Sequence, residues 1–181
     1  MEKEIPKAKI AMVTSRSSLK REFSAGGAVF KKENGVVLWL VAESAPSDGY
    51  PEYWRLPKGW LDDTEDGNFP GQLGSGIKKA TDEDIKKAAL REVIEEGGVE
   101  AKIINKIGTQ RYFRGKKTMK FVTYYLMEWI KDVPEGPGFE TSEVKWLLAD
   151  AAIKFLKYPR EKEVLQKAKR ILDSGLQENL I

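Results

Sequence analysis

The stretch Arg91-Glu92-Val93-Ile94-Glu95-Glu96-Gly97-Gly98-Val99 carries the densest group of acidic residues in this sequence. At about 100° per residue in a helix, Glu92, Glu95 and Glu96 fall within one arc of roughly 100°, a single turn apart. Like charges at this spacing destabilise a helix, and a divalent cation bound between them would relieve the repulsion. Ligands that are all oxygen atoms favour a hard cation, Mg²⁺ or Mn²⁺.

An acidic helix face also has a simpler interpretation. It can be a solvated surface whose carboxylates pair with cations on the same helix, here Lys86, Lys87 and Arg91. The acidic pattern alone does not decide between these two interpretations.

Strand-like and helix-like segments lie on both sides of this stretch. Asn34-Gly35 is the pair that a tight hairpin turn prefers, and Thr81 with Asp84 resembles a capping box. The expected strands cover 23–31, 36–42, 99–113, 119–130 and 144–148, and the expected helices cover 82–96, 149–156 and 160–175. Such interleaving in one short chain predicts an α/β (α+β) sandwich rather than two domains.

Length and composition exclude several classes of protein. The chain has 181 residues and is 41% hydrophobic, which suffices for one core. Its 31 Lys and Arg nearly balance its 28 Asp and Glu, so we expect no nucleic acid duplex as a partner. No apolar run approaches about 18 residues, so we expect no membrane partner. Cys and His are both absent, which leaves acid–base and metal chemistry to carboxylates.

The residues upstream of the acidic stretch add spacing to the pattern. Gly59 is followed after five residues by Glu65, and seven residues separate Glu83 from Arg91. Together with the acidic stretch, this resembles the signature of the Nudix hydrolase family: Gly, five residues, Glu, seven residues, then Arg-Glu-apolar-any-Glu-Glu-any-Gly-apolar. The preceding Leu56-Pro57-Lys58-Gly59 resembles family members that act on dinucleoside polyphosphates and diphosphoinositol polyphosphates. The resemblance implies an α/β/α sandwich with a mixed β-sheet and a Nudix-box helix.

One departure from the family is an insertion inside the motif. Gly59 and Glu83 are 24 residues apart (83 − 59) where the family has six, so 18 residues are inserted (24 − 6). Most of the insertion falls in residues 66–82. Its part 66–79 is rich in Gly, Ser and Pro, and we expect a flexible loop that bulges outward and acts as a lid. Glu83 is the expected equivalent of the family's glutamate, because it shares a helix with the rest of the motif.

The resemblance also implies roles for the residues of the motif. The implied metal ligands are Glu92, Glu95, Glu96 and the main-chain carbonyl of Gly59. Arg91 would orient these glutamates and Glu83 would support them. Without a histidine, the general base would be a carboxylate, either Glu92 or a glutamate on a later loop, where we prefer Glu140 to Glu143. The expected catalytic residues are therefore Arg91, Glu92, Glu95 and Glu140.

Phosphate groups also need cations other than the metal. The expected substrate-binding residues are Arg55, Lys58, Arg111, Arg114 and Tyr112, with Lys116, Lys117 and Lys120 in the same hairpin cluster. Lys116 and Lys117 can equally be an ordinary solvated hairpin tip. The aromatic residues that could stack on a base are Tyr53, Trp60, Tyr112 and Tyr125, although each can instead belong to the core or the sheet surface.

The resemblance implies a metal-dependent pyrophosphohydrolase that cleaves a phosphoanhydride bond in a small nucleoside polyphosphate-type substrate. A dinucleoside polyphosphate is the leading expectation, followed by a diphosphoinositol polyphosphate or a nucleoside triphosphate. A different alternative is a non-catalytic nucleotide-binding domain of the same fold, against which the intact Arg91, Glu92, Glu95 and Glu96 argue. The isopentenyl diphosphate isomerase branch of the family normally relies on a cysteine, which this chain lacks.

The chain divides into three expected parts. Residues 1–21 form a polar lead-in, 22–158 the Nudix hydrolase domain, and 159–181 a C-terminal helix packed on the same domain. The apolar spacing of that helix is equally compatible with a homodimer. No targeting signal is apparent, so the expected location is the cytoplasm.

Overall fold

The structure, a computed structural model, describes residues 19–47 and 51–178. Its strands are β1 (Lys20–Glu33), β2 (Val36–Ser44), β3 (Trp54–Arg55), β4 (Lys58–Trp60), β5 (Val99–Arg114), β6 (Thr118–Asp132) and β7 (Thr141–Leu147). Its helices are α1 (Asp82–Gly97), α2 (Ala149–Phe155) and α3 (Pro159–Glu178). Most of the predicted lead-in, residues 1–18, lies outside the described residues, and 20–21 already belong to β1.

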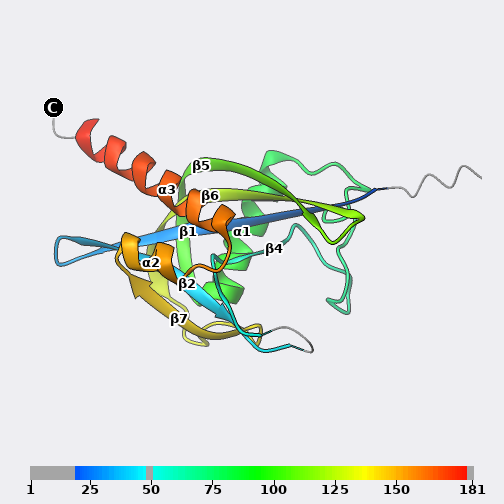
Figure 1. The fold of residues 1–181 in the computed structure, drawn as a ribbon, viewed down its shortest axis with the longest axis horizontal. Helices are drawn as coiled ribbons and strands as arrows, with labels where there is room; N and C mark the ends of the chain where they lie inside the picture. The colour runs from blue at the N-terminus through cyan, green and yellow to red at the C-terminus, as the bar shows by residue number, and fades with distance from the viewer. Residues whose placement is uncertain (1–18, 48–50, 179–181) are drawn as a thin grey trace, which may run out of the picture.

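All the strands join one mixed sheet. The order is β3-β2-β1-β6-β5, with β4 paired to β1 and β7 paired to β2. The central pair β1 and β6 is parallel, whereas the other pairs are antiparallel. Helix α1 covers one face of the sheet, and α2 and α3 cover the other (Figure 1). This three-layer arrangement confirms the predicted fold class.

Local sequence signals account for several element boundaries. Asn34 and Gly35 have φ angles of 50° and 78°, the left-handed values that a tight hairpin between β1 and β2 requires. At the start of α1, the Thr81 side chain accepts a hydrogen bond from the Asp84 amide (3.1 Å), and Asp84 accepts one from the Thr81 amide (2.8 Å). The predicted hairpin and capping box are therefore confirmed.

Helix α1 is oriented by its apolar side. Ala88, Ala89 and Val93 are buried against the sheet in one of the two hydrophobic clusters. Residues four apart lie on the same side of a helix. The positions next to this apolar side therefore face β4. Packing of α1 on the sheet thus determines where the carboxylates of the motif lie.

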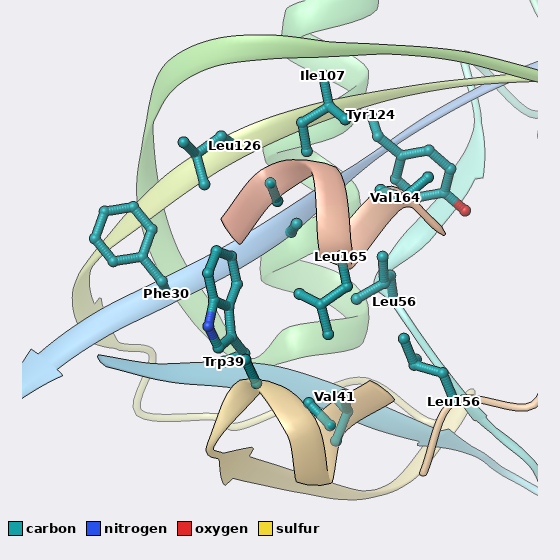
Figure 2. Close-up of a cluster of buried hydrophobic side chains, with 14 of the residues drawn as sticks. Phe30, Trp39, Val41, Leu56, Ile107, Tyr124, Leu126, Leu156, Val164 and Leu165 are labelled. Carbon is teal, nitrogen blue, oxygen red and sulfur yellow. The ribbon is translucent and has the colours of Figure 1, made fainter. Parts of the chain in front are cut away.

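Helix α3 is attached through the second cluster. Val164 and Leu165 pack on the opposite face of the sheet, where Trp39 and Leu126 are also buried (Figure 2). Leu172 belongs to the same cluster. Burying each such side chain contributes about 1.5–3 kcal/mol. This packing fixes the helix, including its first turn, with respect to the sheet.

The inserted stretch differs from the expected outward loop. The Asp62 carboxylate accepts hydrogen bonds from the amides of Leu73 (3.1 Å) and Gly74 (2.6 Å), and the Gly74 carbonyl accepts one from the Phe23 amide of β1 (2.7 Å). Leu73 also packs against the hydrophobic cluster under α1. The expectation of an outward bulge is wrong for this part of the insertion, because one carboxylate and one leucine anchor it to the domain. The last residue of the 66–82 stretch, Asp82, already belongs to α1.

Strands β3 and β4 were not predicted as separate elements. They are two and three residues long, too short to show a periodic pattern. Within the described ranges, no helix is both long enough and apolar enough to cross a membrane.

Candidate active site

The three glutamates of α1 do not share one environment. Glu92 and Glu96, one turn apart, are buried with 5% and 3% of their surfaces exposed. The Glu95 side chain is 55% exposed and lies beside Arg91, with 3.6 Å between Glu95 Oε2 and Arg91 Nε. Within the described part of the chain, no group of three or more acidic side chains is arranged to hold a metal ion. The structure therefore brings together two of the three predicted carboxylate ligands.

Gly59 lies directly against the Glu92 carboxylate. A Cβ atom built on Gly59 would overlap all three carboxyl atoms of Glu92, so only glycine allows this approach. Gly59 is held in place by the pairing of β4 with β1, in which it lies opposite Ala25. The Gly59 main chain thus lies next to the motif glutamate Glu92, as predicted, even though 18 residues are inserted between the two halves of the motif.

Arg91 connects α1 to the end of β4. Its Nη2 atom donates hydrogen bonds to the Trp60 carbonyl (2.8 Å) and to Glu92 Oε1. Together with its contact to Glu95, Arg91 therefore touches both neighbouring glutamates. This geometry matches the orienting role that the family resemblance implies.

Both carboxylate oxygens of Glu96 have partners in the β3–β4 segment. Oε1 lies 2.8 Å from Arg55 Nη1, and Oε2 accepts a hydrogen bond from the Lys58 amide at 2.7 Å. Arg55 is itself buried, and its Nη2 atom donates to the Glu140 carbonyl at 3.3 Å. Arg55 thus joins α1 to the loop before β7.

Burial gives the two buried glutamates pKa values above the ordinary value of a glutamate. Burial, together with the Glu96 charge and against the hydrogen bond from Arg91, raises the pKa of Glu92 to about 7. Burial also raises the pKa of Glu96, while Arg55 and Lys58 oppose this. A carboxylate with a pKa near neutral can accept a proton from water or be neutralised by a cation.

We expect the pKa of Glu92 to make stability depend on pH. The folded state binds the proton more tightly than the unfolded state, where the ordinary value of 4.5 applies. The stabilising contribution is complete below about pH 4.5 and is lost as the pH rises to about 7. In EDTA, the Glu92→Gln variant should gain up to about 3 kcal/mol in free energy of unfolding relative to the wild type between about pH 5 and about pH 8.

Urea denaturation at several pH values measures this difference. Glu100→Gln, which removes an exposed carboxylate paired with Lys131, is the control and should follow the wild type. A gap between Glu92→Gln and the wild type that stays constant with pH would contradict the raised pKa.

The loop before β7 brings Glu140 rather than Glu143 to the site. The Glu140 charge is close enough to raise the pKa values of both Glu96 and Asp63. Glu143 lies within β7, opposite Glu43, and pairs with Lys145 at 3.2 Å. This placement favours Glu140, whose catalytic role remains a prediction.

Glu83 is not brought to the buried pair. It is exposed in the first turn of α1, nine residues before Glu92, or about 13 Å along the helix axis. Its supporting role therefore remains a prediction without a contact to the two buried glutamates.

The predicted substrate-binding cations lie in different settings. The Lys58 side chain is only 11% exposed, and its Nζ atom lies 3.9 Å from Glu161 Oε1 of α3. Arg114 pairs with Glu22 at 2.6 Å, whereas Arg111 is exposed. Burial, together with the Lys58 charge, lowers the pKa of Lys120 to about 8. Lys120 is therefore a less permanently charged cation than a surface lysine.

The aromatic residues that could stack on a base differ in how exposed they are. Tyr53, Trp60 and Tyr112 are partly exposed, and Arg160 lies over the Tyr112 ring at 5.3 Å. Tyr125 is 2% exposed and belongs to the core under α1, so its interpretation as a base-stacking residue is wrong.

The sequence interpretation missed two acidic residues near this site. Asp63 interacts with the charges of Arg91 and Glu140, and no feature of the sequence beyond its position shortly after Gly59 could have indicated this. Glu161 is buried beside Lys58. The sequence could have indicated this burial, because Glu161 lies three and four residues before Val164 and Leu165 and so falls on the apolar face of α3.

The donor set suits a hard divalent cation in its chemistry. Two buried carboxylates and the main chain of Gly59 supply oxygen atoms only, which Mg²⁺ and Mn²⁺ prefer. The buried negative charge that raises the pKa of Glu92 would be neutralised by such an ion.

Comparison with known proteins identifies the family. The NUDIX domain model matches residues 20–168, so the chain belongs to the Nudix family. This confirms the predicted family.

Two solved structures share the fold, and one further protein is similar in sequence, all at low identity. A crystal structure of a C. elegans Ap4A hydrolase binary complex matches with a TM-score of 0.60 and 24% identity, over 84% of this chain and 98% of that one. The NUDIX domain of Shewanella oneidensis NrtR, solved with ADP ribose, has a TM-score of 0.62 and 14% identity, over 84% and 88% of the two chains. The Mycobacterium tuberculosis protein MutT4 is 26% identical over 123 residues, which are 66% of this chain and 42% of that relative. This chain therefore matches less than half the length of MutT4.

Proposed function

We propose that this protein is a divalent-metal-dependent pyrophosphohydrolase that cleaves a phosphoanhydride bond in a nucleoside polyphosphate-type substrate. The observation that carries the proposal is the buried pair Glu92 and Glu96, with the main chain of Gly59 against the Glu92 carboxylate. Membership of the Nudix family supports it.

Glu92, Glu96 and the Gly59 carbonyl are the groups we propose to hold Mg²⁺ or Mn²⁺, with Glu95 as a further ligand from the exposed side of α1. When bound, the ion would neutralise charge on the phosphate oxygens. Arg91 would keep Glu92 and Glu95 in position through its hydrogen bonds to Glu92 and Trp60.

Hydrolysis also needs a group that accepts a proton from the attacking water. Two carboxylates are candidates: Glu92, whose pKa is raised to about 7, and Glu140, which is exposed on the loop before β7. The water oxygen bonds to phosphorus, the anhydride P–O bond breaks, and the proton passes to the carboxylate. A pH–rate profile of the Glu140→Gln variant distinguishes them, because the profile keeps its acidic limb only if Glu92 is the base.

A dinucleoside polyphosphate is the proposed substrate. The Leu56-Pro57-Lys58-Gly59 approach supports this choice, as does the likeness to a structure described as an Ap4A hydrolase. Arg111, Arg114 and Lys120 on the β5–β6 hairpin provide cations for several phosphates, and Tyr53, Trp60 and Tyr112 are partly exposed rings for a base.

A panel of substrates tests the proposal. Phosphate or nucleotide release is measured with Mg²⁺ and with EDTA on dinucleoside polyphosphates, nucleoside triphosphates and a diphosphoinositol polyphosphate. We expect metal-dependent cleavage, fastest for the dinucleoside polyphosphate. If another class reacts faster, that class is the substrate instead of a dinucleoside polyphosphate. Binding without cleavage would favour the non-catalytic nucleotide-binding alternative. A cytoplasmic location and a homodimer remain predictions.

A further inference from the structure

Two positive and two negative side chains are buried together beneath the site. Arg55 and Lys58 come from the β3–β4 segment, Glu96 from α1 and Glu161 from α3. Arg55 contacts Glu96 at 2.8 Å, and the Lys58 ammonium lies 3.9 Å from Glu161. The side chains of Glu96 and Glu161 are 4% and 5% exposed, so each carboxylate depends on a nearby cation for compensation.

The Lys58 ammonium can reach either of these two carboxylates. The Lys58 amide already donates to Glu96 Oε2 at 2.7 Å, so its four-carbon side chain starts next to Glu96 and can fold back to it. In the structure, the ammonium instead points to Glu161, with which it forms the ion pair. Glu161 also accepts a hydrogen bond from the Tyr124 hydroxyl at 3.4 Å, and the packing of α3 holds it in place.

We propose that Glu161 is a positioning residue that keeps the Lys58 ammonium off Glu96, which already pairs with Arg55, so that no second cation competes with a divalent ion for the Glu96 carboxylate. The inference rests on the proposed function, in which Glu96 is a metal ligand. An ammonium that moved to Glu96 would occupy a carboxylate oxygen and add a positive charge where the ion would bind. Through this contact α3, which lies outside the Nudix motif, would tune the affinity of the site for metal.

Mn²⁺ binding in the absence of substrate tests the proposal. The free ion is measured by electron paramagnetic resonance for the wild type, Glu161→Gln, Lys58→Met/Glu161→Gln and Glu163→Gln. Glu163 is exposed on the same helix and provides the matched control. Thermal midpoints are recorded for all four proteins. If Glu161→Gln does not fold, Glu161→Asp replaces it, because it keeps the charge but withdraws it by one methylene.

We expect Glu161→Gln to weaken Mn²⁺ binding about tenfold, which corresponds to about 1.4 kcal/mol. Binding should return toward the wild-type value in the double variant, because the competing ammonium is absent, and Glu163→Gln should match the wild type. Unchanged binding in Glu161→Gln, or a double variant as weak as the single one, would overturn the role of Glu161 alone. A wild-type protein that binds no Mn²⁺ would overturn the proposed metal site and this inference together.

Discussion

Hydrolysis of the preferred substrate is expected to fall at least about 100-fold when Glu96 is replaced by glutamine. The amide keeps the shape of the side chain but removes the charge that we propose to bind the metal. It also leaves Arg55, which lies 2.8 Å from Glu96, without its buried counter-ion. Breaking a buried pair by removing one partner destabilises a protein by roughly 3–5 kcal/mol, so the thermal midpoint should fall as well.

The assay must separate loss of chemistry from loss of folding. Initial rates are therefore compared at a temperature well below the midpoint of the variant, with circular dichroism confirming a folded protein. Glu100→Gln serves as the control for removal of an exposed glutamate. Activity close to that of the wild type in folded Glu96→Gln would refute the assignment of Glu96 to the metal.

The Gly59→Ala variant is expected to be almost inactive, with a loss of at least about 100-fold. The added Cβ would overlap the Glu92 carboxylate, and either β4 or Glu92 must move to accommodate it. Overpacking of this kind also destabilises a fold by about 1–3 kcal/mol. Both kcat and the Mn²⁺ affinity should fall, because the carbonyl of residue 59 and the Glu92 carboxylate would be displaced together.

Gly175→Ala is the matched control for this substitution. Among the described residues, no atom lies within 4 Å of a Cβ built on Gly175, which is part of α3 and far in sequence from the motif, so alanine should leave the activity unchanged. Alanine is also the better helix former, by about 1 kcal/mol. Wild-type rates in Gly59→Ala would show that the close approach of Gly59 to Glu92 has no part in catalysis.

Features encoded by neighbouring residues were predictable from the sequence. The capping box at Thr81, the Asn34-Gly35 hairpin and the glycine end of α1 each depend on contacts within a few residues. The spacing of the Nudix motif predicted the family, and the resemblance to the family predicted the fold. Short-range rules apply at these positions because the hydrogen bonds that they describe are themselves short-range.

Features that depend on distant pairing were not predictable. The anchoring of the insertion by Asp62 needs a loop that returns to β1. The contact of Lys58 with Glu161 joins residues more than 100 positions apart in the chain, and Lys58 therefore lies mostly buried rather than exposed to substrate. The outward position of Glu95 depends on how α1 packs on the sheet, and its partner Arg91 is in turn held by the end of β4.

The most direct test of the central claim is a crystal structure with Mn²⁺ and a non-hydrolysable dinucleoside polyphosphate, read by the anomalous signal of manganese. We predict an anomalous peak bounded by Glu92, Glu96 and the Gly59 carbonyl, with phosphate oxygens completing its coordination. A peak elsewhere, or a well-ordered nucleotide beside Glu92 and Glu96 with no metal between them, would contradict the claim.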